Sequence, residues 1–333
     1  PEMDCDKAYT KINVEPYGGM IMSSWFDRPL SAAGRLIVNE FGKPVSKTVN
    51  ADRDLFIIPN VAVHMNRKIN EGYSYNAQTD LLPLFGGKDA KLMPVICEYA
   101  GIDPESVLGS DLFLYPRTKG TVWGSENEFI SSRALDDLQC VYGILKGFSE
   151  SDLTFYSEYI SMGCIFNNEE TGSLSRQGAD STFLEDVIGR INECFDISKN
   201  RACQIAANSF MISADNAHAV HPNHPELADP TNRPHLNGGI VLKYNAAQKY
   251  TTDGYSEAYF RSICKNASVP VQTYTNRSDI AGGSTLGNLS NRHFSVSTAD
   301  IGLPQLAMHS AYETAGVKDT EYLIRIMKEF FSA

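Results

Sequence analysis

The first part of the chain alternates short apolar runs with turn-forming residues. Between residues 18 and 125, runs such as GRLIV (34–38) and DLFIIP (54–59) are separated by Gly, Pro and Asn. Short apolar runs bounded by such residues are typical of β-strands. The pattern therefore predicts a β-rich region here, with strands at 34–38 and 54–59.

Helical spacing begins near residue 131 and returns at the end of the chain. Two serines that can cap a helix precede apolar residues three and four positions apart: Leu135, Leu138, Val141, Tyr142 and Leu145. The same spacing closes the sequence at Leu323, Ile324, Met327 and Phe330 or Phe331. These patterns predict helices over 131–148 and 319–331, each with an apolar face for packing.

The segment between these helices alternates strand and helix patterns. It predicts strands at 163–166, 209–214 and 239–244, and helices at 181–193 and 257–264. Strands that alternate with helices are typical of an α/β domain with a mostly parallel sheet. A length of 333 residues exceeds what one core usually supports, so we expect two domains or one domain with a large insertion.

Composition excludes several classes of partner. The formal charge of −11, without clusters of Lys and Arg, argues against nucleic acid. No long apolar run or signal peptide is present, so we expect neither a membrane partner nor secretion. Seven dispersed cysteines without a C-x-x-C pair indicate a reducing compartment with buried thiols. We therefore expect a cytoplasmic protein.

Three evenly spaced histidines suggest a metal site at first sight. They lie in SADNAHAVHPNH (213–224) and are His218, His221 and His224. Two prolines in and just after this stretch disfavour a continuous helix, so the spacing does not place three imidazoles on one face. We instead assign Asp215, at the end of a predicted strand, to the metal. His218 and His221 are expected to line the pocket or to fix the loop behind the metal ligands, and His224 to lie on the surface.

Acidic residues recur where predicted strands and helices meet. Glu169 and Glu170 follow the 163–166 strand, and both can serve one site only if the chain bends at 171–173, because neighbouring strand residues face opposite ways. Asp136 and Asp137 fall in the first turn of the 131–148 helix, where a carboxylate can simply favour the helix dipole. Each pair alone is compatible with a solvated surface.

The acidic residues and one histidine gain meaning together. Asp215 ends an apolar strand, and His309 follows the apolar stretch PQLAM. Ligands of α/β sheets gather at the carboxyl ends of strands. The combination of Asp, Glu, Asp and His at one edge is the ligand set expected of a two-zinc hydrolase.

Six ordered blocks make the chain similar to the M18 aminopeptidases, the aspartyl aminopeptidase-like branch of the di-zinc exopeptidases. The blocks are SSWFDRPLSAAGR (23–35), IPNVAVHMNR (58–67), SSRALDDL (131–138), NNEETGS (167–173), ADNAHAVHPNH (214–224) and PQLAMHS (304–310). The resemblance implies a three-layer α/β metallopeptidase catalytic domain formed by residues 1–14 and 126–333. It also implies an inserted β-rich dimerisation domain at residues 15–125.

The same resemblance implies roles for the candidate ligands. Asp136 would bridge two Zn²⁺ ions, Glu170 and His309 would complete one site, and Asp215 would belong to the other. Glu169 would be the general base, in an attack of zinc-bridged hydroxide on the first peptide carbonyl of a short peptide.

Further positions match family residues around the substrate. Lys243 matches a lysine near the specificity pocket, where an ammonium would favour an acidic N-terminal residue. Gly282 and Gly283 lie in the stretch that corresponds to the glycine-rich substrate loop, AGGSTLG (281–287). His64 matches a histidine that reaches the partner subunit's active site. Family members assemble from dimers into large closed homo-oligomers, and we expect this chain to do so too.

One family ligand has no counterpart in this sequence. The family carries a histidine in an H-x-D motif upstream of the block that aligns with residue 1. The sequence thus resembles a family member that lacks its N-terminal segment. We expect this fragment to bind at most one metal well and to have little activity, whereas a chain restored upstream would bind two zinc ions and be active. Two alternatives remain open: a related di-zinc deacylase or carboxypeptidase, and a non-catalytic assembly protein that retains the fold.

Overall fold

The computed structural model describes residues 1–152 and 159–332. The chain forms two compact units: unit 1 comprises Pro1–Lys119 and Ser310–Tyr312, and unit 2 comprises Gly120–His309 and the chain from Glu313 onward. Residues 1–14, expected with the catalytic part, lie in unit 1. The reason is strand pairing, since β1 (Glu2–Cys5) and β2 (Tyr9–Ile12) form a sheet with β5 (Leu84–Gly87).

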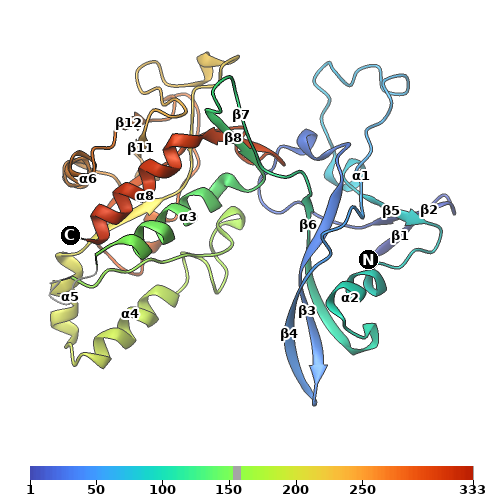
Figure 1. Cartoon of the computed structure of the whole chain (residues 1–333), viewed down its shortest axis with the longest axis horizontal. Helices are drawn as coiled ribbons and strands as arrows, with labels where there is room; N and C mark the ends of the chain where they lie inside the picture. The colour runs from blue at the N-terminus through green and yellow to red at the C-terminus, as the bar shows by residue number, and fades with distance from the viewer. Residues whose placement is uncertain (153–158, 333) are drawn as a thin grey trace. The chain divides into compact units, whose positions relative to one another are not determined.

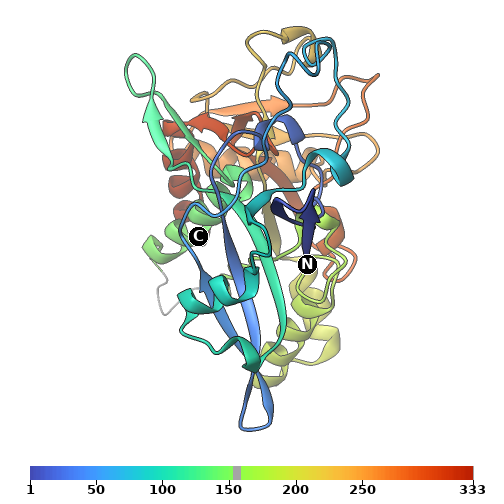
Figure 2. The same cartoon turned by 90° about the vertical axis from the view of Figure 1, so that its right-hand side faces the viewer.

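Unit 1 is built mainly from β-strands, as its short apolar runs predict. A long hairpin of β3 (Leu30–Glu40) and β4 (Lys43–Asn50) pairs with β6 (Val107–Pro116) in an antiparallel sheet of order β4-β3-β6 (Figure 2). The helix α2 (Leu92–Ala100) packs beside it (Figure 2). Its short helices are η1 (Met22–Trp25), α1 (Ala77–Asp80) and η2 (Pro104–Ser106). The strand predicted at 34–38 lies within β3, whereas 54–59 makes only isolated bridges at Phe56 and Ile57.

Unit 2 contains two mixed sheets. In the first, β12 (Val271–Tyr274), β11 (Ile240–Lys243), β13 (Ser297–Gly302) and β9 (Phe210–Ala214) lie side by side in that order. The β11–β12 and β13–β9 pairings are parallel, and β11–β13 is antiparallel. The second sheet has the order β10 (Ala217–His218), β14 (Pro304–Leu306), β15 (Glu313–Gly316), β8 (Phe129–Ser132) and β7 (Thr121–Trp123). The α/β architecture agrees with the sequence prediction.

Helices cover the first sheet of unit 2 and form its core. Figure 1 shows α3 (Leu135–Glu150) and α8 (Val317–Phe331) running side by side, with α6 (Gly254–Asn266) next to them. The other helices are η3 (Glu169–Thr171), α4 (Phe183–Cys194), α5 (Lys199–Ala207), η4 (Pro225–Leu227) and α7 (Gly287–Ser290). The helices predicted at 181–193, 257–264 and 319–331 are thereby confirmed. Within the described ranges, no helix is long and apolar enough to cross a membrane.

The two faces of strand β11 have different surroundings, since one packs into the apolar core and the other carries Lys243. Alternate strand residues point to opposite faces. Ile240 and Leu242 are fully buried among the residues of α3, α6 and α8. Val241 instead packs with Tyr250 and Tyr274 on the other face, which Lys243 shares by the same alternation. A functional site can therefore lie only on the face of the sheet that carries Lys243, because the other face is filled by the apolar core.

Three sequence expectations are wrong at least in part, and the first concerns the start and packing of the helix predicted at 131–148, which is present as α3. The 131–148 helix begins at Leu135 and has no side-chain cap, because 129–132 form a strand. Its predicted apolar face is largely exposed at Leu138, Tyr142 and Leu145, since the helix packs through small residues. At Gly143 a Cβ atom would lie 2.5 Å from Leu323 Cδ2, so α8 approaches where no side chain intervenes.

The other two errors concern the strand at 163–166 and the thiols. Residues 163–166 have no regular structure, because no strand within 1–152 or 159–332 pairs with them. The seven cysteines, all within the described ranges, are free. The expectation that the thiols are buried fails for Cys164, Cys194 and Cys203, which are exposed.

Candidate metal centre

Three predicted ligands come together at one point of unit 2. Nε2 of His309 lies 3.2 Å from Oε2 of Glu170 and 3.5 Å from Oδ2 of Asp136. Potential ligand atoms of these three residues all lie within 4.8 Å of one another. Residues far apart in the sequence therefore present one nitrogen and two carboxylates to a shared space.

A second group of carboxylates shares Asp136 with the first. Asp136, Asp137 and Asp215 also offer oxygens within 4.8 Å of one another. The peptide bond between Asp136 and Asp137 is cis. Because Asp136 belongs to both groups, its carboxylate lies where one ligand could serve two ions.

Each ligand lies at a break in regular structure. Asp136 has non-helical backbone angles at the start of α3, and Asp215 directly follows β9. Glu170 lies in the 3-10 turn η3. Asn168 and Gly172, on either side of this turn, have left-handed backbone conformations. This turn supplies the bend that the sequence required, although no strand leads into it. His309 lies between β14 and β15 with a φ of 65°.

Carboxylates are crowded together in this centre, an arrangement that favours the binding of a cation. Burial and the charge of Asp136 raise the pKa of Glu170 to about 7. Burial raises the pKa of Asp215 to about 7, although Lys243 opposes the shift. The hydrogen bond with Asp136 raises the pKa of His309 to about 9. Acids that resist ionisation and a histidine that holds a proton are typical of acidic clusters without a compensating charge.

The donor set fits zinc. Zn²⁺ binds histidine nitrogen and carboxylate oxygen, and carboxylates commonly bridge ions in two-metal sites. One histidine and two carboxylates form the first group, and a shared aspartate connects it to the second. Asp136, Glu170, His309 and Asp215 are thus placed together, as the resemblance implies.

Glu169 lies beside this centre and outside both ligand groups. Its carboxylate is in the same turn as that of Glu170 and is partly buried. Burial, and then the charge of Asp136, raise its pKa. A carboxyl group with a raised pKa is better suited to proton transfer near neutral pH than an ordinary glutamate.

Polar contacts hold the chain just after the Glu169–Glu170 turn. Asp180, whose side chain is 7% exposed, binds Arg292 Nη1 through Oδ2 at 2.7 Å and His293 Nε2 through Oδ1 at 3.1 Å. The backbone amide of Asp180 donates to the carbonyl of Ser173. The loop that carries the acidic pair is therefore tied to the segment after α7.

Lys243 points its ammonium at the ligand region. Nζ donates to the backbone oxygen of Asn216 at 2.7 Å and lies 3.5 Å from Oδ2 of Asp215. Burial disfavours the charge, yet Asp215 and other anions raise the pKa of Lys243 overall. Gly302 makes room for this arrangement, since a Cβ there would lie 2.1 Å from Asp215 O and 2.8 Å from Lys243 Cε.

His218 belongs to an aromatic wall next to Lys243. Its ring meets Tyr274 edge to face at 6.0 Å, Tyr274 meets Tyr250 at 6.3 Å, and Lys243 Nζ lies 5.5 Å from the centre of the Tyr250 ring. Although part of the His218 ring is open to solvent, the packed protein and the Lys243 ammonium lower its pKa.

The two remaining histidines of the 213–224 stretch lie on the surface. The rings of His221 and His224 are 5.3 Å apart, and His224 pairs with exposed Glu226 at 3.1 Å. His224 therefore lies on the surface, as expected. His221 is exposed as well, and its Nδ1 accepts a hydrogen bond from the amide of Asn223 at 3.2 Å, so it contacts the loop rather than a ligand.

The glycine-rich loop is fixed by side chains around it. Lys249 Nζ donates to the carbonyl of Gly282 at 2.8 Å. Buried Thr285 donates to Oδ1 of Asp300 at 2.8 Å, and Asp300 is itself fully buried in β13. Gly283 has no atom within 4 Å of the position that a Cβ would take. The loop thus has a fixed base and an open edge at Gly283.

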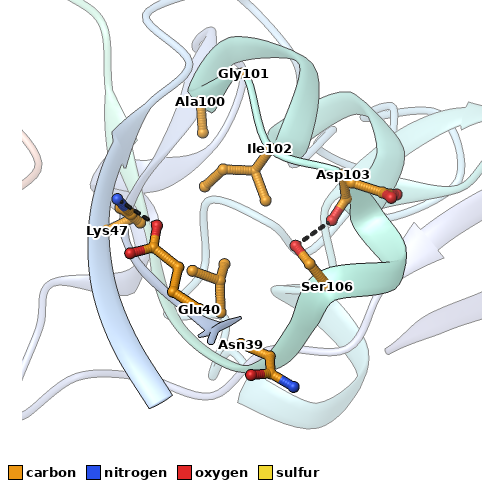
Figure 3. Close-up of a pocket in the computed structure, with 9 residues that line it drawn as sticks. Asn39, Glu40, Lys47, Ala100, Gly101, Ile102, Asp103 and Ser106 are labelled. Carbon is orange, nitrogen blue, oxygen red and sulfur yellow. Dashed lines mark hydrogen bonds and ion pairs between the residues drawn. The ribbon is translucent and has the colours of Figure 1, made fainter. Parts of the chain in front are cut away.

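His64 is exposed in a turn between residues 63 and 65. Unit 1 also has a pocket of about 290 Å³, in which Lys47 pairs with Glu40 at 2.7 Å (Figure 3). It is lined by Val38, Asn39, Glu40, Lys47, Ala100, Gly101, Ile102, Asp103 and Ser106. None of these is a residue that the sequence predicted for a site.

Sequence reasoning missed several groups at the centre. Asp137 belongs to the second ligand group, whereas adjacency to Asp136 suggested only a favourable helix start. The buried side-chain amides of Asn216, next to Asp215 in the sequence, and of Gln139 lie 3.1 Å apart. Glu313 accepts hydrogen bonds from the backbone of two ligands. Asp137 and Asn216 directly follow candidate ligands in the sequence, whereas no spacing marks Glu313, because it comes from a separate strand.

Comparison with known proteins identifies a family for the chain. A sequence model of the family described as aminopeptidase I zinc metalloprotease (M18) matches residues 2–331. A Clostridium acetobutylicum protein named probable M18 family aminopeptidase 2 is 45% identical over 342 residues, covering 100% of this chain and 78% of the relative.

Solved structures show the same fold. A chain in the cryo-EM structure of the Ape4 and Nbr1 complex has a TM-score of 0.91 and 33% identity, covering 99% of this chain and 68% of that chain. The S. cerevisiae mApe1 dodecamer has a TM-score of 0.81 and 25% identity, with 99% and 74% covered. The chain therefore belongs to the M18 family of zinc metalloproteases, whose curated relatives are named as aminopeptidases.

Proposed function

We propose that this protein is a metal-dependent aminopeptidase that removes N-terminal residues from short peptides, with two zinc ions per subunit in the complete chain. The observation that carries the proposal is the shared position of Asp136. Its carboxylate belongs both to the group with Glu170 and His309 and to the group with Asp215. Such sharing suits a bridging ligand between two ions.

The candidate residues would have separate roles in metal binding and proton transfer. Asp136 would bridge, Glu170 and His309 would complete one ion's ligands, and Asp215 would serve the other. Bound zinc would supply Lewis acidity, lowering the pKa of water and polarising the peptide carbonyl. Glu169, which stays outside both groups, would accept a proton from water and pass it to the leaving amine.

Substrate selection would rest on the wall formed by Lys243, His218 and the tyrosines. Lysine has three donors, and Nζ of Lys243 has protein partners in Asn216 O and Asp215. The remaining donor would favour an acidic N-terminal side chain. Gly282 and Gly283 would border the peptide with backbone groups, since the space beside Gly283 is open.

Assembly would complete the enzyme. The related mApe1 of S. cerevisiae forms a dodecamer. We propose that this chain also self-associates through residues 15–125, in the cytoplasm, and that His64 serves the partner subunit's active site. A histidine there would stabilise negative charge on the reacting carbonyl oxygen.

Peptides with free and acetylated N-termini test the proposed function. We expect zinc-dependent release of the first residue from free peptides and none from acetylated ones, with acidic first residues preferred. Faster hydrolysis of acetylated substrates would identify a deacylase, and release from the other end a carboxypeptidase. Stoichiometric zinc binding without hydrolysis of any substrate would favour the assembly protein.

A further inference from the structure

One buried carboxylate connects two of the metal-ligand positions through their backbones. Oε2 of Glu313 accepts a hydrogen bond from the amide of Asp136 at 3.0 Å, and Oε1 accepts one from the amide of His309 at 2.8 Å. Glu313 is only 3% exposed. Each oxygen of one side chain thus holds the main chain of a different candidate ligand.

The contact with Asp136 compensates for a missing helix cap. The first backbone amides of a helix have no partner within the helix, and a side chain normally binds one of them. Ala134, at the N-cap of α3, makes no such bond. Glu313 reaches the amide of Asp136 from β15 instead, and its negative charge suits a helix N-terminus.

The contact with His309 holds an unfavourable backbone conformation. His309 has a φ of 65°, in the left-handed region that non-glycine residues rarely adopt. Glu313 lies four residues further along, at the start of β15, whose pairing with β8 fixes it opposite Ser132. A strand residue therefore anchors a turn that would otherwise be free to relax.

Glu313 has a different role from the ligands themselves. Both of its oxygens point at backbone amides, and it belongs to neither of the two ligand groups found among the described residues. Burial raises its pKa, while the amides of Asp136 and His309 oppose the shift. Its contacts are those of a support for the ligand frame.

We propose that Glu313 is a positioning residue that sets the separation between Asp136 and His309 and thereby the affinity of their metal site. The inference rests on the proposed function, because it takes these two residues as zinc ligands. Groups that orient metal ligands from behind typically change affinity by about 10–100-fold when altered. Glu313 acts on the backbone of its two ligands rather than on their side chains.

The test compares Glu313→Gln with a matched control, Asp319→Asn. Glutamine can accept at only one end, so its amide group would face one backbone N–H. Asp319 is also buried and also accepts from two backbone amides, those of Asn237 at 2.6 Å and Gly239 at 3.1 Å. Both variants therefore lose the same kind of interaction, but only Glu313 contacts candidate ligands.

Zn²⁺ affinity is measured by chelator competition, and Co²⁺ absorption spectra report the ligand geometry. We expect Glu313→Gln to weaken zinc binding by about 10–100-fold and to alter the Co²⁺ spectrum, while Asp319→Asn leaves both unchanged. Glu313→Asp, too short to reach both amides, should also weaken binding and serves if the glutamine variant does not fold.

Three results would overturn the inference. Unchanged zinc affinity in a folded Glu313 variant removes the positioning role. An equal loss in Asp319→Asn attributes the effect to general destabilisation. Absence of zinc binding by the unaltered protein removes both the proposed function and this inference, whereas the first two results leave the proposed function intact.

Discussion

Nζ of Lys243 lies 3.5 Å from Oδ2 of Asp215, and the two side chains are only 3% and 16% exposed. Breaking a buried pair leaves one charge without compensation. We expect Lys243→Met to reduce the free energy of unfolding of the metal-free protein by about 3–5 kcal/mol, measured with urea in the presence of a chelator.

The exposed pair of Lys146 and Glu150 provides a matched control for Lys243. Its side chains are 44% and 40% exposed, so solvent already screens both charges. Lys146→Met should leave the free energy of unfolding almost unchanged. Similar losses in the two variants would show that the Lys243 interaction has no special weight.

Glu169→Gln should separate proton transfer from metal binding. Removal of a general base typically lowers turnover by about 10²–10⁴-fold. Because Glu169 lies outside both ligand groups, zinc content should remain that of the unaltered protein. Glu170→Gln, which removes a candidate ligand, should lose metal as well as activity. Loss of zinc in the Glu169 variant would assign that residue to the metal instead.

His64→Ala tests the contribution of unit 1 to catalysis. If His64 stabilises charge on the reacting oxygen, turnover should fall by about 10²–10³-fold, while zinc content and assembly state stay the same. His224→Ala is the control, since His224 is an exposed histidine of unit 2. Equal turnover in both variants, measured with the same peptide, would exclude a catalytic role for His64.

Asp319 should make stability depend on pH. Burial raises its pKa to about 7 from an ordinary 3.8, although amides of Asn237 and Gly239 oppose the shift. The folded protein then holds this proton more tightly than the unfolded chain. The stabilisation from this proton is complete below about pH 4. It declines by at most about 4 kcal/mol as the pH rises to about 7, and it is constant above that pH.

The difference between the unaltered protein and Asp319→Asn isolates this contribution. Asparagine cannot ionise, so the variant's free energy of unfolding should fall less between about pH 4 and 7. Urea unfolding at several pH values measures both curves. Parallel curves across this window would show that Asp319 does not titrate abnormally.

Local patterns in the sequence determined much of the secondary structure. Leu323, Ile324 and Met327 recur at helical spacing, and all three are buried in α8. The hydrophobic runs at 209–214 and 239–244 form β9 and β11. These predictions succeed because the burial of a helix stripe or a strand depends on residues that are close in sequence.

Local patterns failed where packing overrides them. Leu138, Tyr142 and Leu145 match a buried stripe, yet α3 packs through Gly143 and Gly147 because α8 approaches too closely for larger side chains. Residues 163–166 have the apolar pattern of a strand, but no strand of the described residues pairs with them. Whether an apolar stripe or run is used depends on neighbours that the local sequence does not specify.

The site divides in the same way. The sequence alone identified Asp136, Glu170, Asp215 and His309 as ligand types, through the motifs around them and their resemblance to a family. Only the tertiary structure decided that Asp136 is shared by two ligand groups, that Lys243 is buried against Asp215, and that Glu313 holds two ligands by their backbone. Motifs specify chemical groups, whereas distances between groups arise from strand pairing and helix packing across the whole chain.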